Sequence, residues 1–201
     1  MDSTHPDFWE QRYLAGRTPW DLRGVPAALL DYLRHAPAPG TALLPGCGTG
    51  YETQAFHDFG WRPLAIDFSP AAVQQARTHL GPLASMVREA DFFAGDLGAP
   101  YDLVYERTFL CSLPPSCWPD YAARMTQLLL PGGLLVGLFY YGSDPEGPPF
   151  PIDLERSRQL FNQFDLVEDR PIPVAESLPL FAGFERWQEW RRKPGLCSPA
   201  S

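Results

Sequence analysis

Apolar positions along the chain alternate between two spacings. Short, nearly continuous apolar runs are typical of strands, and segments with apolar residues every three or four positions are typical of helices. Strands are predicted over residues 41–44, 62–66, 85–89, 101–105, 134–141, 164–174 and 184–192. Helices are predicted after Pro6 and over residues 25–35, 51–59, 70–80, 118–130 and 153–161. This alternation predicts an α/β fold in which helices cover both faces of a parallel sheet.

Local signals define several of these boundaries. Ser69 followed by Pro70 is typical of an N-cap and the first helical position. Pro26 falls in the first turn of the helix predicted over 25–35, and residues 131–133 (Pro-Gly-Gly) are expected to end the helix over 118–130. No repeat or domain linker is visible. We therefore expect a single domain over residues 1–201, with 1–36 as a helical lid segment and 193–201 as a flexible tail.

Composition narrows the classes of partner. The 201 residues are 45% hydrophobic and carry a net charge of −8, without a basic run suited to phosphates. Nucleic acid and anionic membranes are therefore disfavoured as partners. We expect no signal peptide, and these residues include no run of membrane-spanning length and no C-x-x-C pair among the four cysteines. We expect a monomeric, cytoplasmic protein that binds a small molecule and no metal.

A glycine turn follows the first predicted strand. Gly46, Gly48 and Gly50 would let the backbone approach a ligand closely. Asp67 ends the second strand about 20 residues later, where an acid can accept hydrogen bonds from two ribose hydroxyls. The G-x-G-x-G spacing differs from the dinucleotide pattern, and Glu52 would repel a phosphate at the next helix. This favours S-adenosylmethionine (SAM) over a dinucleotide; the alternative is an ordinary strand–helix turn.

Further candidates follow the third and fourth strands. Asp91 and Phe92 would bind the amino group and the face of an adenine, or else be a turn acid and a core phenylalanine. Arg107 would hold an anionic acceptor, or else form a surface ion pair with Glu106 or another acid. Trp20 would lie against the sulfonium cation as part of a lid, or else dock the N-terminal segment on the core.

The remaining candidates concern the acceptor. Phe150, in the rigid Gly-Pro-Pro-Phe segment, would close the acceptor pocket, or else belong to a plain connector. Trp9 is expected to pack in the core or the lid and to border the acceptor from there. Cys111 lies near the pocket end, but no histidine is recognisably paired with it, so Cys–His catalysis is a minor alternative.

Together these motifs resemble the thiopurine S-methyltransferase family, which also includes thiol, thiocyanate and halide methyltransferases. The resemblance is carried by residues 8–10, 18–21, 44–52, 65–69, 91–93 and 147–150. It implies a Rossmann-like class I methyltransferase fold, with a seven-stranded, mostly parallel sheet and one antiparallel strand near its end. The expected cofactor-binding set is Trp20, Leu44, Gly46, Gly48, Gly50, Asp67, Phe68, Asp91, Phe92 and Glu106. The expected acceptor set is Trp9, Arg107 and Phe150, with Arg107 as the catalytic residue.

The resemblance implies the reaction but leaves the acceptor open. Residues 18–21 resemble the halide and thiol branch, whereas Arg107 resembles the thiopurine branch. We expect in-line transfer of the SAM methyl to a small soft nucleophile, a thiol or thiopurine-like sulfur, with S-adenosylhomocysteine (SAH) as product. The alternatives are a halide or thiocyanate methyltransferase, an O- or N-methyltransferase, a nicotinamide-dependent oxidoreductase and a non-catalytic SAM-binding module.

Overall fold

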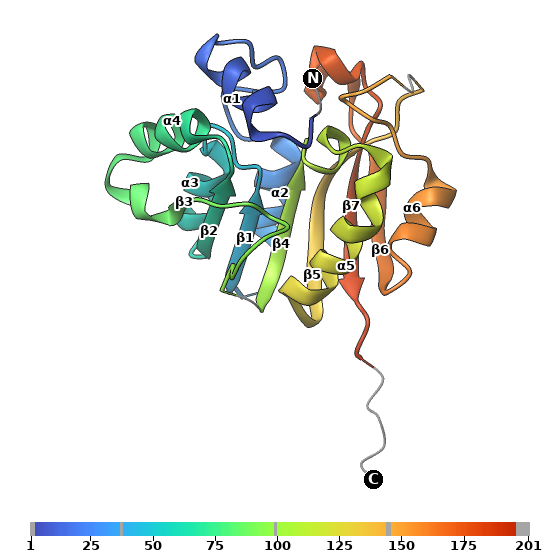
Figure 1. Cartoon of the computed structure of the whole chain (residues 1–201). Coiled ribbons are helices and arrows are strands. Elements are labelled where there is room, and N and C mark those ends of the chain that lie inside the picture. The colour runs from blue at the N-terminus through green and yellow to red at the C-terminus, as the bar shows by residue number, and fades with distance from the viewer. Residues whose placement is uncertain (1–2, 37, 99, 144–145, 196–201) are drawn as a thin grey trace.

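The computed structural model describes residues 3–36, 38–98, 100–143 and 146–195. A seven-stranded sheet with the order β3-β2-β1-β4-β5-β7-β6 forms its centre (Figure 1). The strands are β1 (Thr41–Pro45), β2 (Arg62–Asp67), β3 (Val87–Glu89), β4 (Tyr101–Arg107), β5 (Leu129–Tyr140), β6 (Phe164–Pro171) and β7 (Glu185–Arg192). Residues 196–201, in the predicted tail, lie outside the described residues.

One strand runs against the others. Strands β1 to β5 pair in parallel, β7 pairs antiparallel with β5, and β6 pairs antiparallel with β7. Strand β7 is therefore reversed between two strands that run the same way. This confirms the sheet that the resemblance implied.

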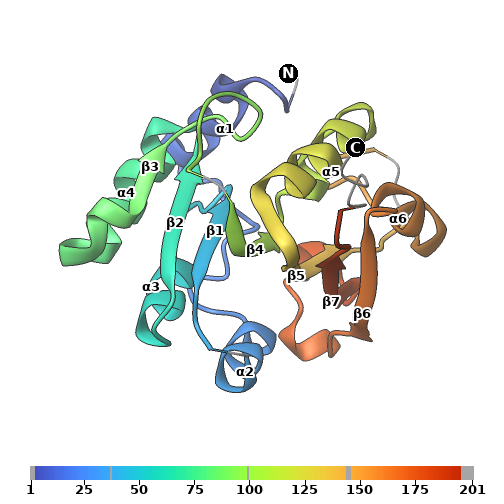
Figure 2. The ribbon, with the colours of Figure 1, turned by 90° about the horizontal axis from the view of Figure 1, so that it is seen from below.

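Helices cover both faces of the sheet (Figure 2). They are α1 (Pro6–Leu14), α2 (Ala27–His35), α3 (Tyr51–Asp58), α4 (Pro70–Leu80), α5 (Trp118–Leu128) and α6 (Leu154–Leu160). Successive strand residues point to opposite faces. Leu43 of β1 therefore packs in the core with Tyr121 of α5, while its neighbour Leu44 packs in a second core with Phe56 of α3.

Several predicted boundaries were wrong. Strand β3 begins at Val87 and not at residue 85, and β4 extends to Arg107 and not to residue 105. The second helix begins at Ala27, because Pro26 has an extended ψ of 137° and is the N-cap. The helix over 118–130 ends at Leu128, because Leu129 already pairs with Tyr101; the Pro-Gly-Gly residues then lie within β5 at a register shift. Strand β6 ends at Pro171 and not at residue 174.

The Ser69 N-cap is confirmed, since its hydroxyl accepts a hydrogen bond from Ala72 N at 3.1 Å. This helix end also holds α1. One carboxylate oxygen of Glu10 accepts from Ser69 Oγ at 2.6 Å and from Ala71 N at 2.9 Å. Helix α1 consequently lies across the carboxyl ends of the parallel strands (Figure 1). Within the described ranges, no helix is long and apolar enough to cross a bilayer.

Candidate active site

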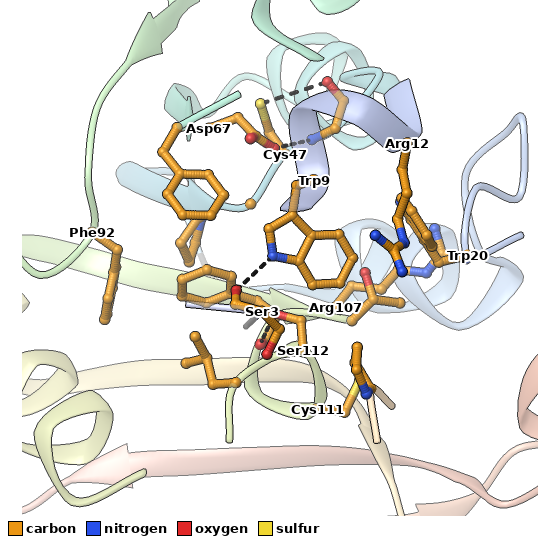
Figure 3. Close-up of a pocket in the computed structure, with 18 of the residues that line it drawn as sticks. Ser3, Trp9, Arg12, Trp20, Cys47, Asp67, Phe92, Arg107, Cys111 and Ser112 are labelled. Carbon is orange, nitrogen blue, oxygen red and sulfur yellow. Dashed lines mark hydrogen bonds between the residues drawn. The ribbon is translucent and has the colours of Figure 1, made fainter. Parts of the chain in front are cut away.

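A cavity of about 730 Å³ opens at the carboxyl ends of the parallel strands, beneath α1 (Figure 3). Its size falls within the roughly 300–1,000 Å³ usual for small-molecule pockets. Most of the residues predicted for the site line it: Trp9, Trp20, Leu44, Gly46, Gly48, Asp67, Phe68, Asp91, Phe92 and Arg107. The structure thus brings together residues from six separate parts of the sequence.

The glycine turn needs glycine for its conformation. Gly46 and Gly48 have φ angles of +62° and +52°, in the left-handed region that side chains disfavour. A Cβ at Gly48 would also lie 2.8 Å from the Tyr13 hydroxyl, and one at Gly46 would lie 2.8 Å from the Phe109 ring. The bare backbone of this turn therefore forms part of the cavity wall.

Asp67 is held against the turn by backbone hydrogen bonds. Its Oδ2 accepts from Gly48 N at 3.1 Å and its Oδ1 accepts from Ser69 N at 2.9 Å. Burial raises the pKa of this carboxyl to about 6. A carboxylate oxygen accepts more than one hydrogen bond, so each oxygen retains capacity for a ligand hydroxyl. This geometry suits the two hydroxyls of a ribose.

Aromatic residues form one end of the cavity. Phe92 is buried and packs edge-on against Phe109, with 5.1 Å between the ring centroids. Asp91 beside it is exposed, and its Oδ1 accepts from Phe93 N at 2.8 Å. Phe92 lies at the opposite end of the cavity from Trp20 (Figure 3). This end can take an adenine between a ring face and a carboxylate.

The N-terminal segment supplies an aromatic roof at the other end. Trp9 and Trp20 pack edge to face, with 5.2 Å between their ring centroids. Trp9 Nε1 donates to Ser3 O at 2.8 Å, and Trp20 Nε1 donates to the Tyr13 hydroxyl at 3.3 Å. Both tryptophans are half-buried and line the cavity. The segment therefore keeps water away from this end of the site.

Arg107 forms an ion pair that the sequence did not reveal. Its Nη1 lies 2.7 Å from Glu52 Oε1, and the side chains are only 10% and 13% exposed. Burial pulls the pKa of Arg107 down, but the charge and hydrogen bond of Glu52, together with Tyr105 and Glu185, outweigh burial, and the pKa lies above its ordinary value. The pair is thus neither at the surface nor with Glu106. It also neutralises Glu52, which weakens the argument that this residue would repel a phosphate.

Three predicted site residues do not line the cavity. Gly50 packs towards Ala76 of α4, where an added Cβ would approach to 3.2 Å. Phe150 turns towards the core beside α5, and only the preceding prolines reach the cavity. Glu106 points to the opposite face of the sheet from Arg107, because neighbouring strand residues alternate between the faces.

The Glu106 side chain instead organises the loop after β4. Its Oε1 accepts from Phe109 N and Leu110 N, both at 2.9 Å, and its Oε2 accepts from the Tyr121 hydroxyl at 2.5 Å. Phe109 and the following turn are thereby held at the cavity wall. Burial raises the pKa of this carboxyl to about 7.

This shift predicts how stability depends on pH. The pKa of Glu106 is raised above its ordinary 4.5. Folding therefore favours the protonated form of this carboxyl. Its contribution to the free energy of unfolding is complete below about pH 4.5 and is lost as pH rises through about 7. The pKa of Asp67 is also raised, so its contribution to stability is lost with rising pH in the same way.

Urea unfolding at pH 5 and at pH 8 tests this role of Glu106. The free energy of unfolding should fall less between these two pH values in Glu106→Gln than in the unaltered protein, by about 2 kcal/mol. The exposed Glu155→Gln serves as control, and an unchanged pH dependence in Glu106→Gln would contradict this role.

Two of the cysteines at the cavity are poor nucleophiles. Cys47, Cys111 and Cys117 line it, but burial raises the pKa of Cys47 and Cys111 well above the ordinary value. Both therefore stay protonated near neutral pH. No histidine of the described residues lines the cavity. The arrangement thus argues against Cys–His catalysis.

Several lining residues carried no recognisable signal in the sequence. They include Arg12, Tyr13, Phe109, Leu180 and Phe181. Arg12 and Tyr13 belong to α1, and basic and aromatic residues are ordinary in a short helix. Leu180 and Phe181 come from a short 3₁₀ turn between β6 and β7 and reach the cavity only through the packing of the sheet.

The reversed β7 and the ligand cavity over a glycine turn define a class I methyltransferase fold. The N-methyltransferase NodS from Bradyrhizobium japonicum, in complex with SAH, has this fold: the TM-score is 0.75 at 20% identity, over 93% of this chain and 98% of that one. The sequence model described as Thiopurine S-methyltransferase (TPMT) matches residues 4–193. The chain belongs to the thiopurine S-methyltransferase family, and its cofactor is SAM.

Relatives within the family differ in their named acceptors. The chain is 34% identical to probable thiol methyltransferase 2 of Arabidopsis thaliana, over 96% of this chain and 88% of the relative. It is 28% identical to thiocyanate methyltransferase 1 of the same plant, over 92% of this chain and 84% of the relative. The names of these relatives give a thiol and thiocyanate as acceptors, so the acceptor of this chain depends on its own cavity.

Proposed function

We propose that this protein transfers the methyl group of SAM to the sulfur of a small thiol. The observation that carries this is the cavity itself, in which the glycine turn and Asp67 share one enclosed space with the Glu52–Arg107 pair. Bound SAM supplies an electrophilic methyl group on a sulfonium. Asp67 would hold its ribose, Asp91 and Phe92 its adenine, and Trp20 would lie near its cationic sulfur.

The end of the cavity beneath Trp9 and Trp20 suits a soft nucleophile. A thiolate and a sulfonium lose their charges as the methyl moves, so a dry aromatic enclosure favours the transition state. Trp9 and Trp20 exclude water, and the enclosure aligns the nucleophile with the methyl group. Arg107 has N–H donors beyond the one directed at Glu52, so it can also hold an anionic sulfur.

The cavity gives less support to oxygen or nitrogen acceptors. Their protons are harder to remove and call for a positioned general base. The lining contains no histidine among the described residues, and Glu52 is held in its ion pair. A thiol, with an ordinary pKa of about 8.5 in cysteine, loses its proton far more readily than an alcohol, and water can accept that proton.

Calorimetry followed by a rate assay tests the proposal. The protein should bind SAM and SAH but not NAD, and the SAM-loaded protein should release SAH when given 3-mercaptopropanol or another small thiol. Thiocyanate, iodide and a thiopurine belong in the same screen. Faster turnover of thiocyanate or iodide than of any thiol would replace the proposed acceptor, and binding of NAD alone would overturn the cofactor.

We also propose a monomer that acts in the cytoplasm on small molecules and not on nucleic acid. A single domain over 1–201, with 1–36 as its lid, fits the position of α1 over the cavity. Light scattering should give a mass near 22.5 kDa at micromolar concentration. A dimer mass would contradict the monomer.

A further inference from the structure

Positive charge gathers on one side of the cavity in a chain whose net charge is −8. Arg12 and Arg17 of the N-terminal segment and Arg107 of β4 all line it. Arg107 is paired with Glu52. Neither Arg12 nor Arg17 has an acidic partner among the described residues. Two arginines at the cavity are therefore available to a ligand.

The acidic residues that line the cavity accept hydrogen bonds from other groups and not from these arginines. Asp21 accepts from Thr49 Oγ1 at 3.2 Å and from Arg23 N at 2.7 Å. Asp67 is held by backbone N–H groups, and Asp91 lies with Phe92 at the far end. None of these three acids forms an ion pair with Arg12 or Arg17, so an anion that enters beneath α1 would meet two cations without an acidic partner among the described residues.

Arg12 is held in place before any ligand arrives. Its guanidinium carbon lies 3.4 Å from the centroid of the buried Phe8 ring, and its Nη1 donates to Phe8 O at 2.8 Å. The same carbon lies 5.9 Å from the Trp9 ring, which packs against Trp20. Figure 3 shows Arg12 and Trp20 at the end away from Phe92. A pre-positioned guanidinium loses little side-chain freedom on binding.

Arg17 strengthens the positive field at this position. Both side chains line this side of the cavity, and the charge of Arg17 is, after burial, a cause that lowers the pKa of Arg12. An anion bound there would offset the repulsion between the two cations. The planar guanidinium donates two parallel hydrogen bonds, a geometry that matches a carboxylate.

We propose that Arg12 and Arg17 bind a carboxylate on the acceptor, so that the preferred substrates are small thiols that also carry a carboxylate. This inference rests on the proposed function, because it presumes a thiol acceptor at the roof end of the cavity. The arginines hold the carboxylate beneath α1, while the aromatic roof covers the carbon chain between it and the sulfur. They are specificity residues and take no part in the methyl transfer itself.

Paired acceptors test this inference. 3-Mercaptopropionate and 3-mercaptopropanol have the same chain length and differ in charge. At saturating SAM, the unaltered protein should prefer the mercaptopropionate. Arg12→Gln/Arg17→Gln should raise the KM for mercaptopropionate about 10-fold or more, because it removes two charge-assisted contacts. It should change kcat/KM for mercaptopropanol less than about 2-fold. Arg34→Gln, an exposed arginine outside the cavity, should change neither.

Other outcomes separate the possible failures. Equal loss for both thiols, or an unchanged preference, would overturn the carboxylate site. A matching rise in the Kd for SAH would assign the arginines to the cofactor's own carboxylate and overturn the inference too. If no thiol reacts, the proposed function is overturned. In that case calorimetry of both thiols with the SAH-bound protein still tests the arginines: an equal affinity for mercaptopropionate and mercaptopropanol would overturn their role.

Discussion

Asp67→Ala should weaken SAH binding about 100-fold, because two ribose hydroxyls lose a charged acceptor that two backbone N–H groups hold in place. Isothermal titration calorimetry at pH 8 measures this directly. At that pH the carboxyl is ionised in the unaltered protein, since its pKa is about 6.

The same titration separates cofactor binding from folding. Asp91→Ala removes a second carboxylate from the cavity, but an exposed one at the adenine end, and should weaken SAH binding only about 10-fold. Asp58→Ala, outside the cavity, should have no effect. Circular dichroism shows whether each variant is folded. A folded Asp67→Ala protein with unchanged affinity would place the ribose elsewhere.

The second large effect is expected from the Glu52–Arg107 pair. Arg107→Gln and Glu52→Gln should each lower the free energy of unfolding by about 3 kcal/mol, because each leaves one buried charge without its partner. The double variant removes both charges and should recover most of that stability. Catalysis should not recover in the double variant. Arg107→Gln and the double variant should both have a kcat/KM for thiols about 100-fold lower than the unaltered protein. In Glu52→Gln the fall in kcat/KM should be much smaller.

This double-mutant cycle distinguishes two roles of Arg107. Urea unfolding and initial rates are measured on all four proteins, together with the Kd for SAH. If activity returned along with stability in the double variant, Arg107 would be structural only. If the Kd for SAH rose in parallel with the loss of activity, the arginine would act on the cofactor and not on the acceptor.

Local signals account for what the sequence predicted well. The elements, the reversed strand implied by the family motifs and the Ser69 cap all follow from short stretches of chain. The glycine turn and Asp67 meet because they end two adjacent parallel strands, and this register is set within one strand–helix–strand unit. Boundaries failed where pairing with another strand overrode local preference, as at Leu129.

Contacts between distant segments could not be predicted in this way. Glu52 and Arg107 are 55 residues apart and lie on different elements, so no spacing rule joins them. Glu106 and Arg107 are neighbours, yet the pleat of β4 sends one to Tyr121 and the other to the cavity. A strand residue's face depends on register, which a one-residue shift would reverse.

By itself, the sequence determined the class of fold and the meeting of the glycine turn with Asp67, because each is encoded by contiguous strand, turn and helix. Only the tertiary structure decided the rest of the cavity. That part is assembled from α1, the end of β4, the proline segment after β5 and the 3₁₀ turn before β7. These segments meet only when the sheet has formed and α1 has docked through Glu10 on the cap of α4.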